Sequence, residues 1–159
     1  MAVTLQQFAE AARRYCEWSE GPPGVGQAEA QKAFDLLVNL LPGFPPVQGG
    51  HGGGAGRSIT YEDWKRMHAR FASSMPFQYY ECRHKPFDLG DREHEIADMA
   101  DDLADIWRDL KPGLELYDSN ERVKAAAEWK FGFEKHWGRH ATAALYALHC
   151  WLVDNRQSP

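Results

Sequence analysis

The sequence predicts an all-α fold, a single-domain bundle of about five helices. Apolar residues recur at helical spacing along most of the chain, and no segment shows the alternation of apolar and polar residues that is typical of a half-buried strand. Stretches rich in proline and glycine separate the helical segments. With 159 residues, of which 43% are hydrophobic and 26% charged, the chain has the size and composition of one globular domain spanning residues 1–159.

Two helices are expected before residue 42. Thr4 and Gln7 have the spacing of a capping box at the start of the first helix, and the Gly-Pro-Pro-Gly run at residues 21–24 ends it. The second helix spans about residues 27–41. Residues 42–58 contain two adjacent prolines and seven of the 14 glycines, so we expect a flexible loop there.

The third helix is expected to begin with a second capping box and to end before Pro76. Thr60 and Asp63 form that box, and the apolar seam of the helix consists of Tyr61, Trp64, His68 and Phe71. Residues 77–90, which follow it, are expected to be irregular.

The fourth and fifth helices are expected to fill the rest of the chain. Asp91 caps the fourth helix, and Pro112-Gly113 should end or kink it, with a further turn over residues 114–117. Asp118 and Glu121 have the spacing of a third capping box, which opens a fifth helix over about residues 120–153.

Charge and hydropathy exclude several classes of function. Residues 88–109 carry nine acidic residues and two arginines, whereas residues 120–156 carry six basic and four acidic residues, within a total net charge of −5. An acidic chain lacks the clustered Lys and Arg of a nucleic-acid-binding protein. No apolar run approaches the roughly 18–20 residues of a membrane span, and residues 1–15 lack the apolar core of a secretory signal. We therefore expect a cytoplasmic protein that binds neither nucleic acid nor membranes.

The three cysteines do not form a recognisable motif. Cys16, Cys82 and Cys150 are more than sixty residues apart, and no Cys-x-x-Cys pair exists. A zinc knuckle, a redox motif and a disulfide scaffold are therefore poorly supported, and we interpret all three as free thiols without a functional role.

The fourth helix divides into an apolar seam and, roughly opposite, an acidic stripe. Like charges four residues apart on a helix oppose its formation by a few tenths of a kcal/mol per pair. The stripe is therefore either a solvated surface or a place where something cationic sits, such as a metal ion, a basic partner or the fifth helix. The acidic stripe consists of Asp98, Asp101, Asp102, Asp105 and Asp109.

The fifth helix is apolar on most sides, which predicts burial between neighbouring helices. His136 and His140 lie on one of its inward faces, four residues apart, whereas Arg139 belongs to a narrow polar strip. Buried imidazoles need hydrogen-bond partners, and this spacing also suits two ligands of one transition-metal ion. Three interpretations stay open: a structural His–Asp network, a metal site completed by the acidic stripe, and a catalytic or ligand-binding site.

Two segments of these helices resemble a bacterial family known as a domain of unknown function, number 5063. They are Asp-Asp-Leu-Ala-Asp-Ile-Trp-Arg-Asp-Leu-Lys at residues 101–111 and Trp-Lys-Phe-Gly-Phe-Glu-Lys-His-Trp-Gly-Arg-His-Ala at residues 129–141. The resemblance is dense over about 60 residues and implies a small all-helical cytosolic domain. It supplies no activity, cofactor or catalytic residue. Pro112 and the glycine-rich residues 49–56 depart from the family pattern.

Motifs of well-known enzyme classes are missing from the sequence. Residues 52–58 do not match the P-loop pattern, and neither Gly-x-Ser-x-Gly nor His-Glu-x-x-His occurs. The favoured hypothesis is a non-catalytic acidic interaction or binding module without a cofactor, which meets a protein partner through the acidic stripe. The alternative is a metal-binding helical protein or metal-dependent hydrolase that uses His136 and His140 with Asp98, Asp102 or Asp105. The candidate site therefore comprises Asp98, Asp101, Asp102, Asp105, Asp109, His136, Arg139 and His140.

Overall fold

The computed structural model describes residues 3–41 and 59–156 and confirms the all-α prediction. Over these residues it has five helices, one of them interrupted by a π-helical turn, and one small β-hairpin, and 71% of the described residues are helical. The loop predicted at residues 42–58 lies outside the described residues. In chain order the elements are α1 (Leu5–Glu20), α2 (Gln27–Leu40), α3 (Tyr61–Ser74), β1 (Tyr79–Cys82), β2 (Glu95–Asp98), α4 (Met99–Asp118), α5 (Arg122–Gly132), the π-helical turn η1 (Phe133–Trp137) and α6 (Gly138–Asp154).

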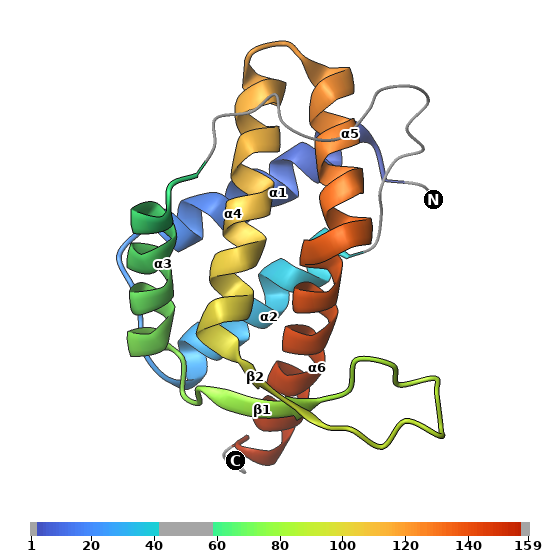
Figure 1. Cartoon of the computed structure of the whole chain (residues 1–159). Helices are drawn as coiled ribbons and strands as arrows, with labels where there is room; N and C mark the ends of the chain where they lie inside the picture. The colour runs from blue at the N-terminus through green and yellow to red at the C-terminus, as the bar shows by residue number, and fades with distance from the viewer. Residues whose placement is uncertain (1–2, 42–58, 157–159) are drawn as a thin grey trace.

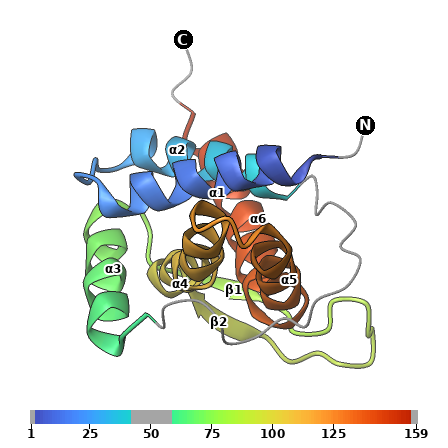
Figure 2. The ribbon, with the colours of Figure 1, turned by 90° about the horizontal axis from the view of Figure 1, so that it is seen from above.

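The helices form two layers. α4 runs antiparallel to the long helix made of α5, η1 and α6, and α3 flanks α4 (Figure 1). Seen from above, α1 and α2 lie across one side of these helices as a second layer, and the hairpin lies on the opposite side (Figure 2). Large side chains that are almost fully buried fill the core; among them are Trp129, Trp137, Tyr15, Phe8 and Phe71.

The two capping boxes that start α1 and α3 form as predicted. The Thr4 hydroxyl accepts from the Gln7 N–H, and the Thr60 hydroxyl accepts from the Asp63 N–H, at 3.1 Å in both cases. The seam predicted for α3 is partly wrong, because Tyr61 is 68% exposed and Met67 is buried in its place.

The hairpin was not expected, and it displaces the start of α4. β1 and β2 pair antiparallel, so residues 79–82 are a strand rather than irregular, and α4 begins at Met99 instead of after Asp91. Asp98 is the actual cap, because its side chain accepts from the N–H groups of Ala100 and Asp101. The strand sequences, Tyr-Tyr-Glu-Cys and Glu-Ile-Ala-Asp, do not alternate between apolar and polar residues, so the sequence carries no strand signal there.

Pro112 does not end α4, which continues to Asp118. Proline removes one backbone donor from the helix, but tertiary contacts hold the helix on both sides of it. The Trp129 indole donates to the carbonyl of Leu110 at 2.9 Å, and Leu114 beyond the proline is 5% exposed. Burial of the helix therefore outweighs the local preference of proline to break it.

The fifth helix differs from its prediction at its start and in its middle. The expected capping box does not form: Glu121 caps α5 without a side-chain hydrogen bond, and Asp118 pairs instead with Arg13 on α1. Residues 133–137 form the π-helical turn η1. Gly138 permits this turn, because a Cβ there would lie 2.4 Å from the Phe133 carbonyl oxygen. A π turn contains one more residue than an α turn would, so it shifts the side chains that follow around the helix axis.

Candidate metal centre

The acidic stripe on α4 faces the two histidines of the long helix. α4 and α6 run side by side (Figure 1), and α4 also contacts η1. Three aspartates of the stripe lie on one face of α4, because they are spaced three and four residues apart: Asp102, Asp105 and Asp109. His136 in η1 and His140 in α6 project toward that face. We call Asp102, Asp105, Asp109, His136 and His140 the Asp–His cluster.

Three potential ligand atoms of the Asp–His cluster form a nearly equilateral triangle. His136 Nε2 and His140 Nε2 lie 3.2 Å apart. Asp105 Oδ2 lies 3.4 Å from the first nitrogen and 3.3 Å from the second. The two ring nitrogens and this carboxylate oxygen therefore meet at one point between the helices.

The other ring nitrogen of each histidine is held by a second carboxylate. His136 Nδ1 lies 2.7 Å from Asp109 Oδ2, and His140 Nδ1 lies 2.7 Å from Asp102 Oδ1. A carboxylate accepts hydrogen bonds, so each Nδ1 carries a proton. In the metal-free protein Nε2 of His136 is protonated as well and donates to Asp105 Oδ2, and a bound metal ion would replace that proton. Three electron-pair donors in contact repel one another until a proton or a metal cation lies among them.

Asp105 is oriented by groups on its other oxygen. Its Oδ1 accepts from Trp64 Nε1 of α3 at 2.8 Å and lies 2.8 Å from Nη2 of Arg108. Oδ2 is therefore the oxygen directed at the histidines. Burial acts to raise the pKa of Asp105, but the hydrogen bond from His136 and the charge of Arg108 outweigh burial and lower it. The carboxylate is thus held in its ionised form.

The remaining cluster members have shifted pKa values that follow from the same contacts. Hydrogen bonds to Asp105 and Asp109 raise the pKa of His136 to about 10. Burial raises the pKa of Asp102, against the hydrogen bonds from His140 and Tyr80. Asp102 and Asp105 are only 4% and 6% exposed. Perturbed ionisable groups gathered in one place mark a candidate functional site.

Comparison with known proteins places this cluster in a family. Residues 61–154 match the model of a family described as "Domain of unknown function (DUF5063)". This match covers more than half of the chain and contains every residue of the Asp–His cluster.

The chain belongs to the DUF5063 family.

The fold of this DUF5063 protein is shared with a solved structure. Protein BF1032 from Bacteroides fragilis superposes with a TM-score of 0.66 at 18% sequence identity, over 92% of this chain and 93% of that chain. At this identity the likeness establishes the fold alone. No curated protein matches the sequence. Among the described residues of this DUF5063 protein, no helix is long and apolar enough to cross a membrane.

The structure separates the other predicted site residues of the DUF5063 protein from the triangle. Asp98 caps α4 and bonds His68 Nε2 through Oδ2 at 3.1 Å, and Arg139 lies against the ring of His84. Asp101 belongs to a second group of possible ligands with Asp102 and His140. Both oxygens of Asp102 are already engaged, by His140 and by Tyr80, so the second group has no free carboxylate oxygen on Asp102.

Three contributors to the site lie outside the predicted set. Trp64, Tyr80 and Arg108 bond the aspartates of the cluster from α3, the hairpin and α4. The sequence spacing could have identified Arg108, because it lies three residues after Asp105 on the same helix. No sequence pattern could have identified Trp64 and Tyr80 as site residues, since their positions depend on how α3 and β1 pack against α4.

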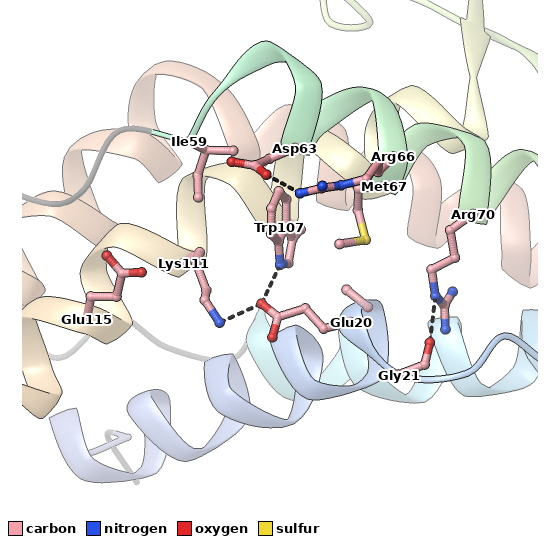
Figure 3. Close-up of a pocket in the computed structure, with 11 residues that line it drawn as sticks. Glu20, Gly21, Ile59, Asp63, Arg66, Met67, Arg70, Trp107, Lys111 and Glu115 are labelled. Carbon is pink, nitrogen blue, oxygen red and sulfur yellow. Dashed lines mark hydrogen bonds and ion pairs between the residues drawn. The ribbon is translucent and has the colours of Figure 1, made fainter.

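A cleft of about 460 Å³ lies apart from the cluster, between α1, α3 and α4 (Figure 3). Trp107 and Met67 line it, and the Trp107 indole donates to Glu20 at 3.0 Å. The three cations in its wall are paired within the protein: Lys111 with Glu20, Arg66 with Asp63, and Arg70 with the carbonyl of Gly21. In the described part of the chain each of these cations has an internal partner, although Nη1 of Arg70 is buried without one, and the Asp–His cluster is the stronger candidate.

Proposed function

We propose that this protein binds a divalent transition-metal ion, with Zn²⁺ as the best fit, through Asp105 Oδ2, His136 Nε2 and His140 Nε2. The observation that carries the proposal is the triangle of these atoms, whose edges measure 3.2, 3.3 and 3.4 Å. Two ligands of a tetrahedral zinc ion, each bonded at about 2.0–2.1 Å, lie about 3.3–3.4 Å apart. The three atoms are therefore spaced as three corners of a zinc coordination sphere.

The contacts around the triangle support the same function. Metal-binding histidines donate their other ring N–H to a carboxylate or carbonyl, which fixes the tautomer and the ring orientation. Asp109 and Asp102 accept these bonds from His136 and His140 at 2.7 Å. The ligand carboxylate of Asp105 is held in the same way through its second oxygen.

The ligand count supports a site that takes up a further ligand. Three protein ligands leave the fourth tetrahedral position of zinc to water or substrate, whereas structural zinc sites use four protein ligands. The site also opens to solvent on one side, because the side chain of His136 is 38% exposed. Metal-assisted hydrolysis is therefore the reaction class to assay once metal binding has been measured.

The acidic stripe gives little support to an interaction module. A partner that recognises acidic groups needs them at the surface, but Asp102 and Asp105 are nearly buried and bond the cluster histidines. Asp109 is held by His136 and Asp98 by His68. The charges of the stripe are largely satisfied within the chain, so the metal-binding alternative is the better explanation of the arrangement.

Metal titration of chelator-treated protein tests the proposal. Zn²⁺ binding is followed by calorimetry, Co²⁺ binding by visible absorption, and thermal unfolding is recorded with and without metal. We expect one ion per chain and a higher melting temperature, because a ligand present at 100 times its dissociation constant stabilises a protein by about 2.7 kcal/mol.

Two asparagine variants make the test specific. Asp105→Asn keeps the shape of the side chain but removes the ligand charge, and we expect it to lose most of the metal affinity. Asp88→Asn makes the same change at an exposed residue of the hairpin loop and should bind like the wild type. Wild-type protein that takes up no Zn²⁺ or Co²⁺, or an Asp105→Asn variant that binds as tightly, would refute the proposal.

A further inference from the structure

The hairpin brings a tyrosine to the edge of the Asp–His cluster. β1 pairs with β2 in a register that places Tyr80 opposite Ala97. α4 begins directly after β2, at Met99, so Tyr80 lies beside the first turn of that helix. Side chains alternate along a strand: Tyr79 is 62% exposed, whereas Tyr80 is half-buried and reaches Asp102.

A continuous chain of hydrogen bonds joins this tyrosine to a metal ligand. The Tyr80 hydroxyl donates to Oδ2 of Asp102, and Oδ1 of the same carboxylate accepts from His140 Nδ1 at 2.7 Å. His140 then presents Nε2 to the triangle. Because Asp102 is only 4% exposed, water has little access to replace either donor.

We propose that Tyr80 is a positioning residue of the metal site, through which the hairpin sets the metal affinity. The inference rests on the proposed function, and it adds a residue that does not touch the metal. Without the Tyr80 hydroxyl, one oxygen of the buried Asp102 carboxylate loses its donor, and the bond from His140 alone holds the plane of that carboxylate less firmly. The ring of His140 is then no longer fixed in the orientation that aims Nε2 at the metal.

The expected loss of metal affinity can be scaled from other metalloproteins, in which hydrogen-bond partners of the ligands have been removed. Removal of a partner that orients a metal-binding histidine typically lowers metal affinity by about 10–100-fold. Tyr80 acts one bond further out than Asp102, so we expect Tyr80→Phe to weaken Zn²⁺ binding by about 10-fold, at the lower end of that range.

Two phenylalanine variants on the same strand provide the test. Zn²⁺ affinity is measured by competition with a chelator, and the coordination geometry by the visible spectrum of the Co²⁺ form. Tyr80→Phe should weaken binding and alter the Co²⁺ spectrum, while Tyr79→Phe removes the same hydroxyl from an exposed side chain and should change neither. A folded Tyr80→Phe protein with the affinity and spectrum of the wild type would overturn the inference.

A second variant keeps the inference testable if Tyr80→Phe does not fold. Asp102→Asn keeps the side-chain shape but weakens the bond to His140, so it should also lower the affinity; unchanged binding would count against the chain of bonds. In the Asp102→Asn background, Tyr80→Phe should change the affinity little further, because Tyr80 acts through Asp102. Wild-type protein that binds no metal would instead refute the proposed function itself, so the two failures are distinguishable.

Discussion

Replacing Gly113 with alanine tests how α4 and α5 are held together. A Cβ on Gly113 would lie 2.2 Å from Nε1 and 2.6 Å from Cδ1 of Trp129. That indole is fully buried, donates to the Leu110 carbonyl at 2.9 Å, and packs edge-on against Phe8 with ring centroids 4.9 Å apart. A rigid ring enclosed on these sides has no room to turn away, so the added methyl group must push α5 from α4.

The expected cost is the balance of three effects. Overpacking a core costs about 1–3 kcal/mol, and a buried indole N–H left without its acceptor costs about 1–3 kcal/mol more. The better helix propensity of alanine returns about 1 kcal/mol. We therefore expect Gly113→Ala to lower the free energy of unfolding by about 3 kcal/mol, which corresponds to a fall of about 6–12 °C in the melting temperature of a domain of this size.

Urea unfolding, followed by tryptophan fluorescence and by circular dichroism, measures this loss. Gly132→Ala is the matched control: its Cβ would come no closer than 3.0 Å to Trp137 Cδ1, and the helix gains propensity. We expect the control to stay within about 1 kcal/mol of the wild type. A Gly113→Ala protein as stable as this control would refute the packing argument.

Three other predictions concern side chains in different parts of the molecule. In metal-free protein, the losses of unfolding free energy caused by Asp105→Ala and His140→Ala should differ from additivity by about 0.5–3 kcal/mol in a double-mutant cycle measured by urea unfolding, because the two side chains lie 3.3 Å apart. Additive losses would mean that the pair does not interact. A thiol reagent should label the exposed Cys150 much faster than Cys16, because burial raises the pKa of Cys16 to about 12. The variant Cys150→Ser should lose the fast reaction. Rapid labelling that survives in this variant would show that another thiol is accessible. A hydrogen bond from Arg13 on α1 lowers the pKa of Asp118, so Asp118→Asn should lower the free energy of unfolding by less than about 1 kcal/mol at neutral pH. This difference should disappear as the pH falls through the lowered pKa, because the carboxylate then takes up a proton. A difference in unfolding free energy that persists in strong acid would contradict the assignment.

Predictions from the sequence succeeded where a structure depends on residues close together in the chain. The capping boxes at Thr4 and Thr60 involve residues three positions apart, and both form. The third expected box, at Asp118, fails because Arg13, 105 positions away, binds that carboxylate. The paired residues of the hairpin are 13 to 19 positions apart in the chain, and neither strand alternates between apolar and polar residues.

Helical periodicity also brought the right groups of residues into consideration for the candidate site. It placed the aspartates on one face of α4 and His136 and His140 on one face of the fifth helix. The eight candidate residues included all five members of the Asp–His cluster, but they also included Asp98 and Arg139, which bond His68 and His84 instead. Which aspartate meets which histidine depends on the relative depth and rotation of two helices, and periodicity within one helix does not contain that information.

The sequence by itself determined that the chain forms helices, where most of them lie, and that a strongly acidic face and a pair of histidines occur on two of them. Only the tertiary structure decided that the long helix packs against this face, that Asp105 forms a triangle with His136 and His140, and that Tyr80 of the hairpin bonds Asp102. The physical reason is the range of the forces involved. Backbone hydrogen bonds within helices and caps act between residues a few positions apart. The carboxylates behind the net charge of −5 bond the imidazoles only when packing brings the two groups within 3.5 Å of one another.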